Sequence, residues 1–306
     1  MLTQAQLQRF AHESGIRSLE IVEKEVVLTY FLQLLSERGF LADLAFKGGT
    51  CIRKTWLGSN GRFSTDVDFT ALHSGKSPED YVLELAEIAE APFHGIQFEV
   101  DVGDKGWYGV DDGVSWGILP NYRHELGTGT LKLQVSNREA PTLPTDSRDQ
   151  IEISYFKHLP FSPAQLTCLR IEEILAEKIR ATYQRNKPRD IWDLDNFAGR
   201  PFSEPLIRKL MIIKLWQVRD GFSAERWNAK LTVARTWDWD DLRQLVRGGV
   251  ADPLEMLARC TRRFAFLADM NADEAALAAD LYQRRGDVHQ KLVAECNALA
   301  LEHRLT

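Results

Sequence analysis

The stretch from Leu44 to Gly61 constrains the fold more than any other part of this chain, because it predicts a strand, a glycine turn and a short helix in succession. The apolar run that begins at Leu44 is short and ends at Gly48-Gly49, where a backbone without side chains can turn sharply. Thr50 is placed to cap a helix over residues 51–57, and the glycines that follow end this helix. This order favours a mixed sheet with helices.

Two aspartates lie on the strand that we expect next, over residues 65–70. Alternation along this strand places Asp66 and Asp68 on one face, opposite to Val67. Their Cα atoms then lie about 7 Å apart, which lets both carboxylates bind the same hard cations. Magnesium takes oxygen ligands, usually from one or two protein carboxylates, while phosphates and waters complete its shell. We therefore expect one or two Mg²⁺ ions at Asp66 and Asp68.

The glycine turn strengthens this interpretation, because the backbone N–H groups at the start of a helix attract phosphate. The hydroxyl of Thr50 or of Ser64 can add a hydrogen bond to a phosphate. Together, the turn and the carboxylates predict an NTP site where metal ions activate an attacking hydroxyl and neutralise the leaving pyrophosphate. Read as structure only, Gly48-Gly49 is a tight turn and the aspartates form a solvated strand face.

The remaining patterns predict an α+β protein with two domains. Helical periodicity and strand alternation both occur up to about residue 160. The expected elements are helices over 18–37 and 79–91 and strands over 96–102, 129–136 and 150–156. After Pro160–Pro163, helical periodicity dominates to the end of the chain. We therefore expect a mixed sheet with helices in residues 1–160 and a mainly α-helical domain in residues 161–306.

Charge is distributed unevenly between these two parts. The net charge is −6, with 15 basic and 23 acidic residues in 1–160 but 23 basic and 21 acidic residues in 161–306. Basic residues of the second part include Lys178, Arg180, Arg185, Lys187, Arg189, Arg208, Lys209, Lys214, Arg219, Arg226, Lys230 and Arg235. Such clustering fits either a local phosphate-binding face or an ordinary solvated helix surface.

The sequence carries no pattern of a secreted or membrane protein. Met1–Leu7 lacks the basic and apolar segments of a secretory signal, and no stretch approaches the roughly 18 to 20 apolar residues that span a bilayer. The cysteines show neither metal-ligand spacing nor the density of a disulfide framework. We therefore expect a cytoplasmic protein with buried cysteines and no membrane partner.

Lys178 stands where a lysine is unexpected. On a helical wheel it falls within the apolar stripe that Ile171 and Ile174 belong to. Desolvating an ammonium is unfavourable unless an anion meets it, so this position suggests a helix that lines a cleft and a lysine that points at a bound phosphate. Alternatively, the side chain reaches the surface along its own stem.

A further helix is expected to start at Pro188, with Arg189 and Asp190 in its first turn. From these residues alone, Asp190 is a carboxylate that interacts favourably with the helix dipole. Arg189 either binds phosphate or pairs with Asp193.

Three blocks of this sequence resemble the AbiEii-type nucleotidyltransferases, the toxins of type IV-like toxin–antitoxin and phage-abortive systems. The blocks are Gly48-Gly49-Thr50 with Arg62-x-Ser64-x-Asp66-x-Asp68-Phe69, then Glu172–Ala181, and finally Arg185–Leu194. The resemblance implies a nucleotidyltransferase-like N-terminal domain. It also implies an enzyme that transfers a nucleotide, with a pyrimidine base, from an NTP to an RNA acceptor, the 3′ end of tRNA. A cognate antitoxin protein would relieve the resulting growth arrest.

The resemblance also implies roles for individual residues. The residues with catalytic roles are Asp66, Asp68, Lys178 and Asp190. The nucleotide-binding residues are Lys47, Gly48, Gly49, Thr50, Arg62, Ser64 and Arg189. On this interpretation, Asp190 either orients Lys178 or accepts a proton from the acceptor hydroxyl.

This sequence departs from the common pattern at one position. Many nucleotidyltransferases place a third carboxylate on a neighbouring strand, but the counterpart here, on residues 131–136, is Gln134. This leaves open whether one ion or two are bound. Glu152 or Asp101 is an alternative third ligand, and Lys132 is an alternative contact for the phosphates.

Two other functions fit the same residues. An antibiotic-modifying nucleotidyltransferase shares the glycine turn and the Asp-x-Asp pattern, and it predicts resistance rather than growth arrest. An inactive nucleotide- or protein-binding module that lost the third acid predicts that Asp66→Ala leaves any overexpression phenotype unchanged.

Overall fold

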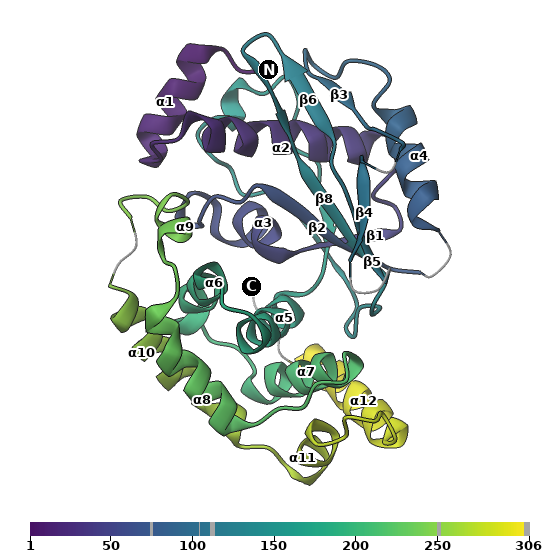
Figure 1. Ribbon diagram of the computed structural model, residues 1–306, viewed down its shortest axis with the longest axis vertical. Coiled ribbons are helices and arrows are strands. Elements are labelled where there is room, and N and C mark those ends of the chain that lie inside the picture. Colours follow the sequence, from purple (N-terminus) through teal and green to yellow (C-terminus); the bar gives the residue numbers. More distant parts are fainter. Residues whose placement is uncertain (74–75, 104, 111–113, 250–251, 303–306) are drawn as a thin grey trace. The chain divides into compact units, whose positions relative to one another are not determined.

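The computed structural model describes residues 1–73, 76–103, 105–110, 114–249 and 252–302 (Figure 1). The chain forms two compact units. The first unit contains Met1–Ala140, Thr145–Cys168 and Gln244–Gly248, and the second contains Pro141–Pro144, Leu169–Arg243 and Gly249–Thr306. The chain therefore passes between the units more than once.

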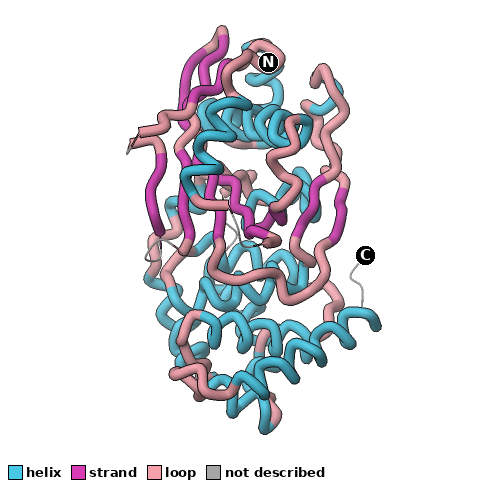
Figure 2. Tube along the Cα trace, turned by 90° about the vertical axis from the view of Figure 1, so that its right-hand side faces the viewer, coloured by secondary structure: helices cyan, strands magenta, loops and turns pink. Residues whose placement is uncertain are grey.

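A seven-stranded sheet runs through the first unit. The strands drawn in magenta in Figure 2 all belong to this unit. Its order is β4-β5-β8-β2-β1-β10-β9, and a second sheet has the order β3-β6-β7. β2 pairs antiparallel with β1 and parallel with β8, which confirms a mixed sheet. The strands are β1 Leu44–Lys47, β2 Asp66–Ala71, β3 Gln97–Glu99, β4 Trp107–Val110, β5 Ser115–Ile118, β6 Asn121–His124, β7 Gly127–Thr130, β8 Lys132–Ser136, β9 Asp146–Arg148 and β10 Leu166–Cys168.

Strand alternation explains the two faces of the large sheet. Phe46 of β1 lies opposite Phe69 of β2, and Val67 of β2 lies opposite Leu133 of β8. All four side chains are buried and share one face. The intervening residues point to the other face, which places both aspartates of β2 away from this apolar layer.

The helices of the first unit largely match the sequence patterns. They are α1 Gln4–Ser14, α2 Leu19–Glu37, α3 Gly48–Ile52 and α4 Pro78–Ile88, with helical turns η1 Arg53–Leu57, η2 Gly58–Asn60 and η3 Phe156–His158. α2 confirms the helix that we expected over residues 18–37, and most of its residues from Val22 to Leu35 are buried. The helix expected over 79–91 ends earlier, at Ile88.

The expected role of Thr50 as a helix cap is wrong. α3 begins at Gly48, with Lys47 as its N-cap residue. The Thr50 hydroxyl donates instead to the backbone carbonyl of Asp66. Thr50 therefore ties α3 to β2 through its side chain, a contact between distant residues that no local pattern indicates.

β8 Lys132–Ser136 confirms most of the strand expected over residues 129–136, whereas residues 129 and 130 belong to β7 of the other sheet. The N–H of Leu131, between the two strands, donates to the carbonyl of Pro120 at 2.8 Å. A second strand prediction is wrong. Residues 150–156 form no strand. The N–H of Ile151 donates to the carbonyl of Lys54 at 2.7 Å, so the segment is fixed to the π-helical turn η1.

The second unit is mainly α-helical, as expected. Its helices are α5 Ile171–Gln184, α6 Pro188–Ala198, α7 Glu204–Gln217, α8 Ala224–Val233, α9 Asp240–Arg243, α10 Pro253–Arg263, α11 Ala272–Ala278 and α12 Gly286–Glu302, with turns η4 Ala234–Thr236 and η5 Ala265–Ala268. α7 contacts α5, α11 and α12 and is almost entirely buried from Leu206 to Leu215. Among the described residues, no helix has both the length and the apolar character that crossing a membrane requires.

A short segment, Gln244–Gly248, returns from the helices to the first unit. The N–H of Phe63 donates to the carbonyl of Leu245 at 2.7 Å, and Val246 is buried. The segment therefore fixes the backbone at Phe63, the residue between Arg62 and Ser64.

Candidate active site

Two side chains shape the glycine turn between β1 and α3. Gly48 has a φ of 78°, a left-handed conformation that favours glycine. A Cβ atom on Gly48 would collide with a carboxylate oxygen of Asp68, and one on Gly49 would collide with the guanidinium group of Arg62. The two glycines therefore leave room for a carboxylate and a guanidinium group beside the turn.

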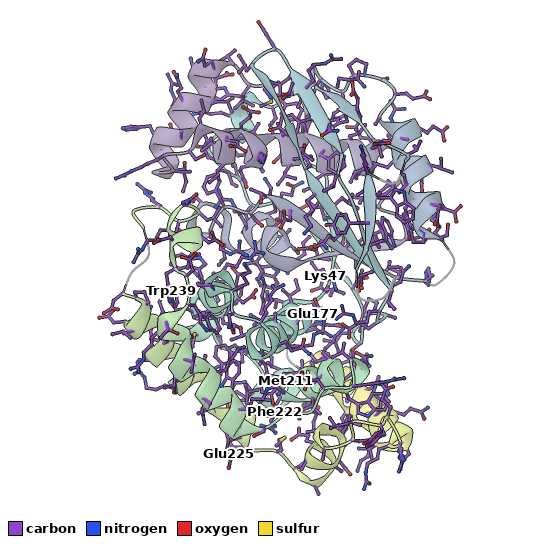
Figure 3. The ribbon with its side chains drawn as sticks, in the orientation of Figure 1. Lys47, Glu177, Met211, Phe222, Glu225 and Trp239 are labelled. Carbon is purple, nitrogen blue, oxygen red and sulfur yellow. The ribbon has the colours of Figure 1, made fainter. Side chains whose placement is uncertain are left out.

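Asp68 lies in a row of polar residues that crosses three strands. It pairs with Lys47 on β1 and with Gln134 on β8, while Asp66 pairs with Lys132 on β8. Lys47, labelled in Figure 3 at the end of β1, is 9% exposed, and the other four residues are half-buried. Paired residues on adjacent strands point to the same face, so these five side chains share one face of the sheet.

Three more of the side chains predicted to bind the nucleotide, those of Thr50, Arg62 and Ser64, are buried. Thr50 has no exposed surface, and its hydroxyl is used by the carbonyl of Asp66. Arg62 is 3% exposed and donates from Nη1 to the carbonyl of Phe63 at 3.2 Å. Ser64 is 8% exposed. In this structure, the contacts of Thr50 and Arg62 hold the loop and the turn in place.

The donor set on β2 suits a magnesium ion. Asp66 and Asp68 offer only oxygen ligands, and Gly48 leaves the space that the Asp68 carboxylate occupies. Magnesium is commonly held by one or two carboxylates together with phosphate oxygens and waters. Gln134 offers an amide oxygen at the third position, which is a neutral ligand. The residues therefore fit one ion that a bound triphosphate helps to hold.

The alternative third carboxylates lie elsewhere. Asp101 follows β3 of the three-stranded sheet, and Glu152 is exposed in the segment that forms no strand. Neither belongs to β1 or β8, the strands that flank β2. Across the described ranges, no group of three or more His, Cys, Asp or Glu side chains is arranged to hold a metal ion.

A second charged cluster lies in the second unit, between α5 and α6. The Nζ atom of Lys178 is 3.0 Å from Oδ1 of Asp190 and 2.7 Å from Oδ2 of Asp193. Arg185 donates two more hydrogen bonds to Asp190, at 2.8 and 3.0 Å. Lys178 is 7% exposed, and both carboxylates are buried. The anions beside this buried ammonium are thus protein carboxylates.

These cations keep Asp190 ionised. Burial alone would raise the pKa of the Asp190 carboxyl, but the charge of Lys178 and the hydrogen bonds and charge of Arg185 outweigh it and hold the pKa well below its usual range. A carboxylate with so low a pKa accepts protons poorly at neutral pH. Asp190 is therefore better suited to orienting Lys178 than to acting as a general base.

The cluster also contains Asp193 and Arg185, which the sequence analysis does not assign to it. Asp193 lies three residues after Asp190, on the same face of α6, and it contacts Lys178 although we had considered it as a partner for Arg189. Arg189 is half-buried. The sequence did contain a signal for this cluster: two acids three residues apart on one helix, together with a lysine in the apolar stripe of the preceding helix.

The structure separates the basic residues of the second half into buried and exposed groups. Lys214 pairs with Glu173 at 2.6 Å, and Lys209 and Arg208 both pair with Glu274. These cations stabilise the helical unit from within. Exposed basic residues of this half include Lys187, Arg219, Arg226 and Arg235.

Comparisons with known proteins found a matching family and similar solved structures. The model of one family, described as nucleotidyl transferase AbiEii toxin of the type IV toxin–antitoxin system, matches residues 30–302. No curated protein matches the chain by sequence. Among solved structures, the chain is similar to MenT4, a nucleotidyltransferase toxin from Mycobacterium tuberculosis H37Rv, with 29% identity and a TM-score of 0.79 over 97% of this chain and 100% of that one. A candidate nucleotidyltransferase from H. pylori shares the fold, with 18% identity and a TM-score of 0.50 over 82% of this chain and 96% of that one.

Proposed function

Because this chain belongs to the AbiEii nucleotidyl transferase toxin family of type IV toxin–antitoxin systems, we propose that it transfers a pyrimidine nucleotide from an NTP to the 3′ end of a tRNA. The modified tRNA would no longer serve translation, and growth would stop until a cognate antitoxin relieves the block. We place this reaction in the cytoplasm, where NTPs and tRNA are both abundant.

The polar row around Asp68 carries this proposal. Asp66 and Asp68 would hold Mg²⁺, while Lys47, opposite Asp68, and Arg62, above Gly49, would meet the phosphates. Gly48, Gly49, Thr50 and Ser64 would shape the turn that receives the triphosphate. A carboxylate pair flanked by cations suits a substrate that brings both metal and negative charge.

The chemistry is an in-line displacement at the α-phosphorus. The oxygen of the tRNA 3′ hydroxyl forms the new bond to phosphorus, the bond to the bridging oxygen breaks, and pyrophosphate leaves, while the hydroxyl proton passes to water. A magnesium ion, when bound, supplies Lewis-acid stabilisation of the developing charge. The family resemblance also leads us to propose a catalytic role for Lys178, which Asp190 would orient, and a phosphate-binding role for Arg189.

Transfer of label to tRNA tests this proposal. The protein is incubated with total tRNA, Mg²⁺ and each of the four NTPs labelled at the α-phosphate. We expect label on tRNA from CTP or UTP, and none after periodate has oxidised the 3′-terminal diol. Absence of transfer from every NTP would exclude the proposal.

Expression in cells separates the two other functions. Antibiotic resistance without growth arrest would point to a small-molecule nucleotidyltransferase. Growth arrest that persists in Asp66→Ala would point to an inactive binding module. The proposed enzyme predicts arrest by the wild type and none by this variant.

A further inference from the structure

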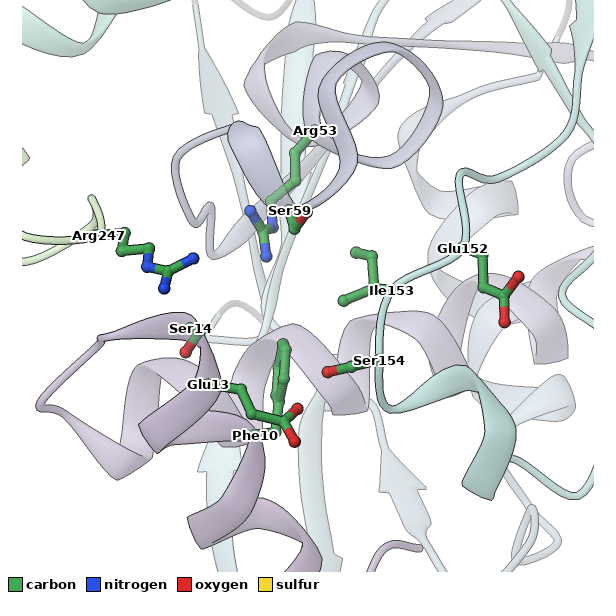
Figure 4. Close-up of a pocket in the computed structure, with 9 residues that line it drawn as sticks. All are labelled: Phe10, Glu13, Ser14, Arg53, Ser59, Glu152, Ile153, Ser154 and Arg247. Atoms are coloured by element: carbon green, nitrogen blue, oxygen red, sulfur yellow. The ribbon is translucent and has the colours of Figure 1, made fainter.

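The first unit contains a cavity of about 230 Å³ whose walls come from distant parts of the sequence (Figure 4). α1, the turns η1 and η2, residues 152–154 and the returning segment Gln244–Gly248 all contribute to it. The described residues that line it include none that we assign to metal or nucleotide binding. Any ligand of this cavity is therefore distinct from the proposed NTP.

Arg53 is the most deeply buried polar group in the cavity wall, with 1% of its surface exposed. Its Nη1 donates to the carbonyls of Gly58 and Gly61, and its Nε lies 3.1 Å from Oε1 of Glu25. These contacts leave the Nη2 side of the guanidinium group for the cavity, into which the side chain points in Figure 4.

Arg53 shares its buried carboxylate with a second side chain. Oε1 of Glu25 also lies 2.8 Å from Nζ of Lys54, whose pKa burial lowers, so the Arg53 guanidinium group does not have this carboxylate to itself. Tyr155 contacts Lys54 but stays neutral, because burial raises the pKa of its hydroxyl well above the usual value. Since an uncompensated buried charge is unfavourable, an anion next to Arg53 would stabilise this cluster.

Other polar groups around the cavity fit an oxyanion. Arg247 reaches inward from the returning segment, and Ser59 and Ser154 offer hydroxyl groups (Figure 4). Glu13 also lines the cavity, whereas the carboxylate of Glu152 points away from the other side chains. The cavity thus combines two guanidinium groups, two hydroxyls and one inward carboxylate.

We propose that this cavity binds hydrogen phosphate, with Arg53 and Arg247 as its cationic ligands and Glu13 as an acceptor. A carboxylate repels a fully ionised oxyanion, but hydrogen phosphate keeps one P–OH group that can donate to Glu13. Its other oxygens accept charge-assisted hydrogen bonds from the guanidinium groups. Sulfate has no such proton at neutral pH, so the site selects phosphate over sulfate.

Calorimetric titration of the full chain with phosphate and with sulfate, at constant ionic strength, tests this site. We expect saturable binding of phosphate and at least tenfold weaker binding of sulfate. Arg247→Ala should weaken phosphate binding at least fivefold, and Glu13→Gln should bring phosphate and sulfate affinities closer together. Arg53→Lys, which keeps the buried charge but loses the forked donor, should also weaken phosphate binding.

Two control variants locate the ion. Arg38→Ala removes an exposed arginine outside the cavity, and Lys47→Ala removes a cation of the proposed nucleotide site; both should bind phosphate like the wild type. Unchanged binding in Arg247→Ala, equal affinity for sulfate, or loss of binding in Lys47→Ala would each overturn the proposal. None of these results depends on whether the enzyme transfers nucleotides.

Discussion

The carboxylate of Asp68 occupies the space that a Cβ atom on Gly48 would fill. The glycine turn therefore does more than reverse the chain, because it lets a proposed metal ligand approach the end of β1 closely. Arg62 and Gly49 are related in the same way. The positions of the Asp68 and Arg62 side chains thus depend on the absence of side chains at Gly48 and Gly49.

Gly48→Ala should displace the Asp68 carboxylate and slow nucleotidyl transfer by about a hundredfold, the loss expected for a catalytic group moved by about 1 Å. Gly39→Ala is the matched control, because Gly39 has the same φ of 78° and its Cβ atom would meet no other group. Both variants should lose about 1 to 2 kcal/mol of stability through backbone strain. Transfer rates and urea unfolding measure the two effects, and similar activity in both variants would contradict the role of Asp68.

Gln134→Glu should place a third carboxylate beside Asp68, its partner across β2 and β8. An added anionic oxygen strengthens binding of a hard cation, so the Mg²⁺ concentration for half-maximal transfer should fall by about tenfold. Gln134→Ala, which adds no charge, should need at least as much Mg²⁺ as the wild type. If Gln134→Glu needs the same Mg²⁺ concentration for half-maximal transfer as the wild type, the metal is not held by the polar row around Asp68.

Lys178→Met should destabilise the protein strongly, because it leaves the buried carboxylates of Asp190 and Asp193 without this ammonium. Removing one partner of a buried ion pair typically costs about 3 to 5 kcal/mol. Arg185→Ala should cost less than about 1 kcal/mol, since the Arg185 side chain is 51% exposed. Urea unfolding measures both values, and equal losses would show that burial does not control this cluster.

The stabilising effect of Asp190 should disappear in acid. Its pKa is lowered in the folded state, so its contribution is complete above the unfolded pKa of about 3.9 and is lost as the pH falls towards the folded value. In that interval the unfolded chain binds the proton and the folded chain does not. The difference in unfolding free energy between the wild type and Asp190→Asn should be constant above about pH 5 and shrink below about pH 4. A difference that grows as the pH falls would contradict the assignment.

Local patterns made the centre of the first unit predictable. α2 and β2 each lie within one residue of their expected bounds, because their apolar spacing is regular and glycines or polar residues end them. The strand that carries Gln134 was correctly expected beside β2, and the register confirms that Gln134 faces Asp68. The family pattern, rather than periodicity, directed attention to this strand.

Contacts between distant residues were not predictable. The bond from Phe63 to Leu245 joins residues that lie far apart in the chain, and nothing in the sequence near Leu245 marks it as part of the first unit. The buried pair of Glu25 and Lys54 likewise lies within apolar stretches that read as ordinary amphipathic helix. Such pairs depend on which elements pack together, and periodicity does not encode that choice.

The rate of nucleotide transfer by Asp68→Asn tests the central claim most directly. This variant keeps the shape of the side chain beside Gly48 and removes only its charge, so the protein should remain folded. With tRNA, Mg²⁺ and the preferred α-labelled NTP, we expect label transfer and pyrophosphate release by the wild type and at least a hundredfold loss of both in Asp68→Asn, as one electrostatic contact in a reacting centre contributes about this factor. Transfer by folded Asp68→Asn at the wild-type rate would contradict the account.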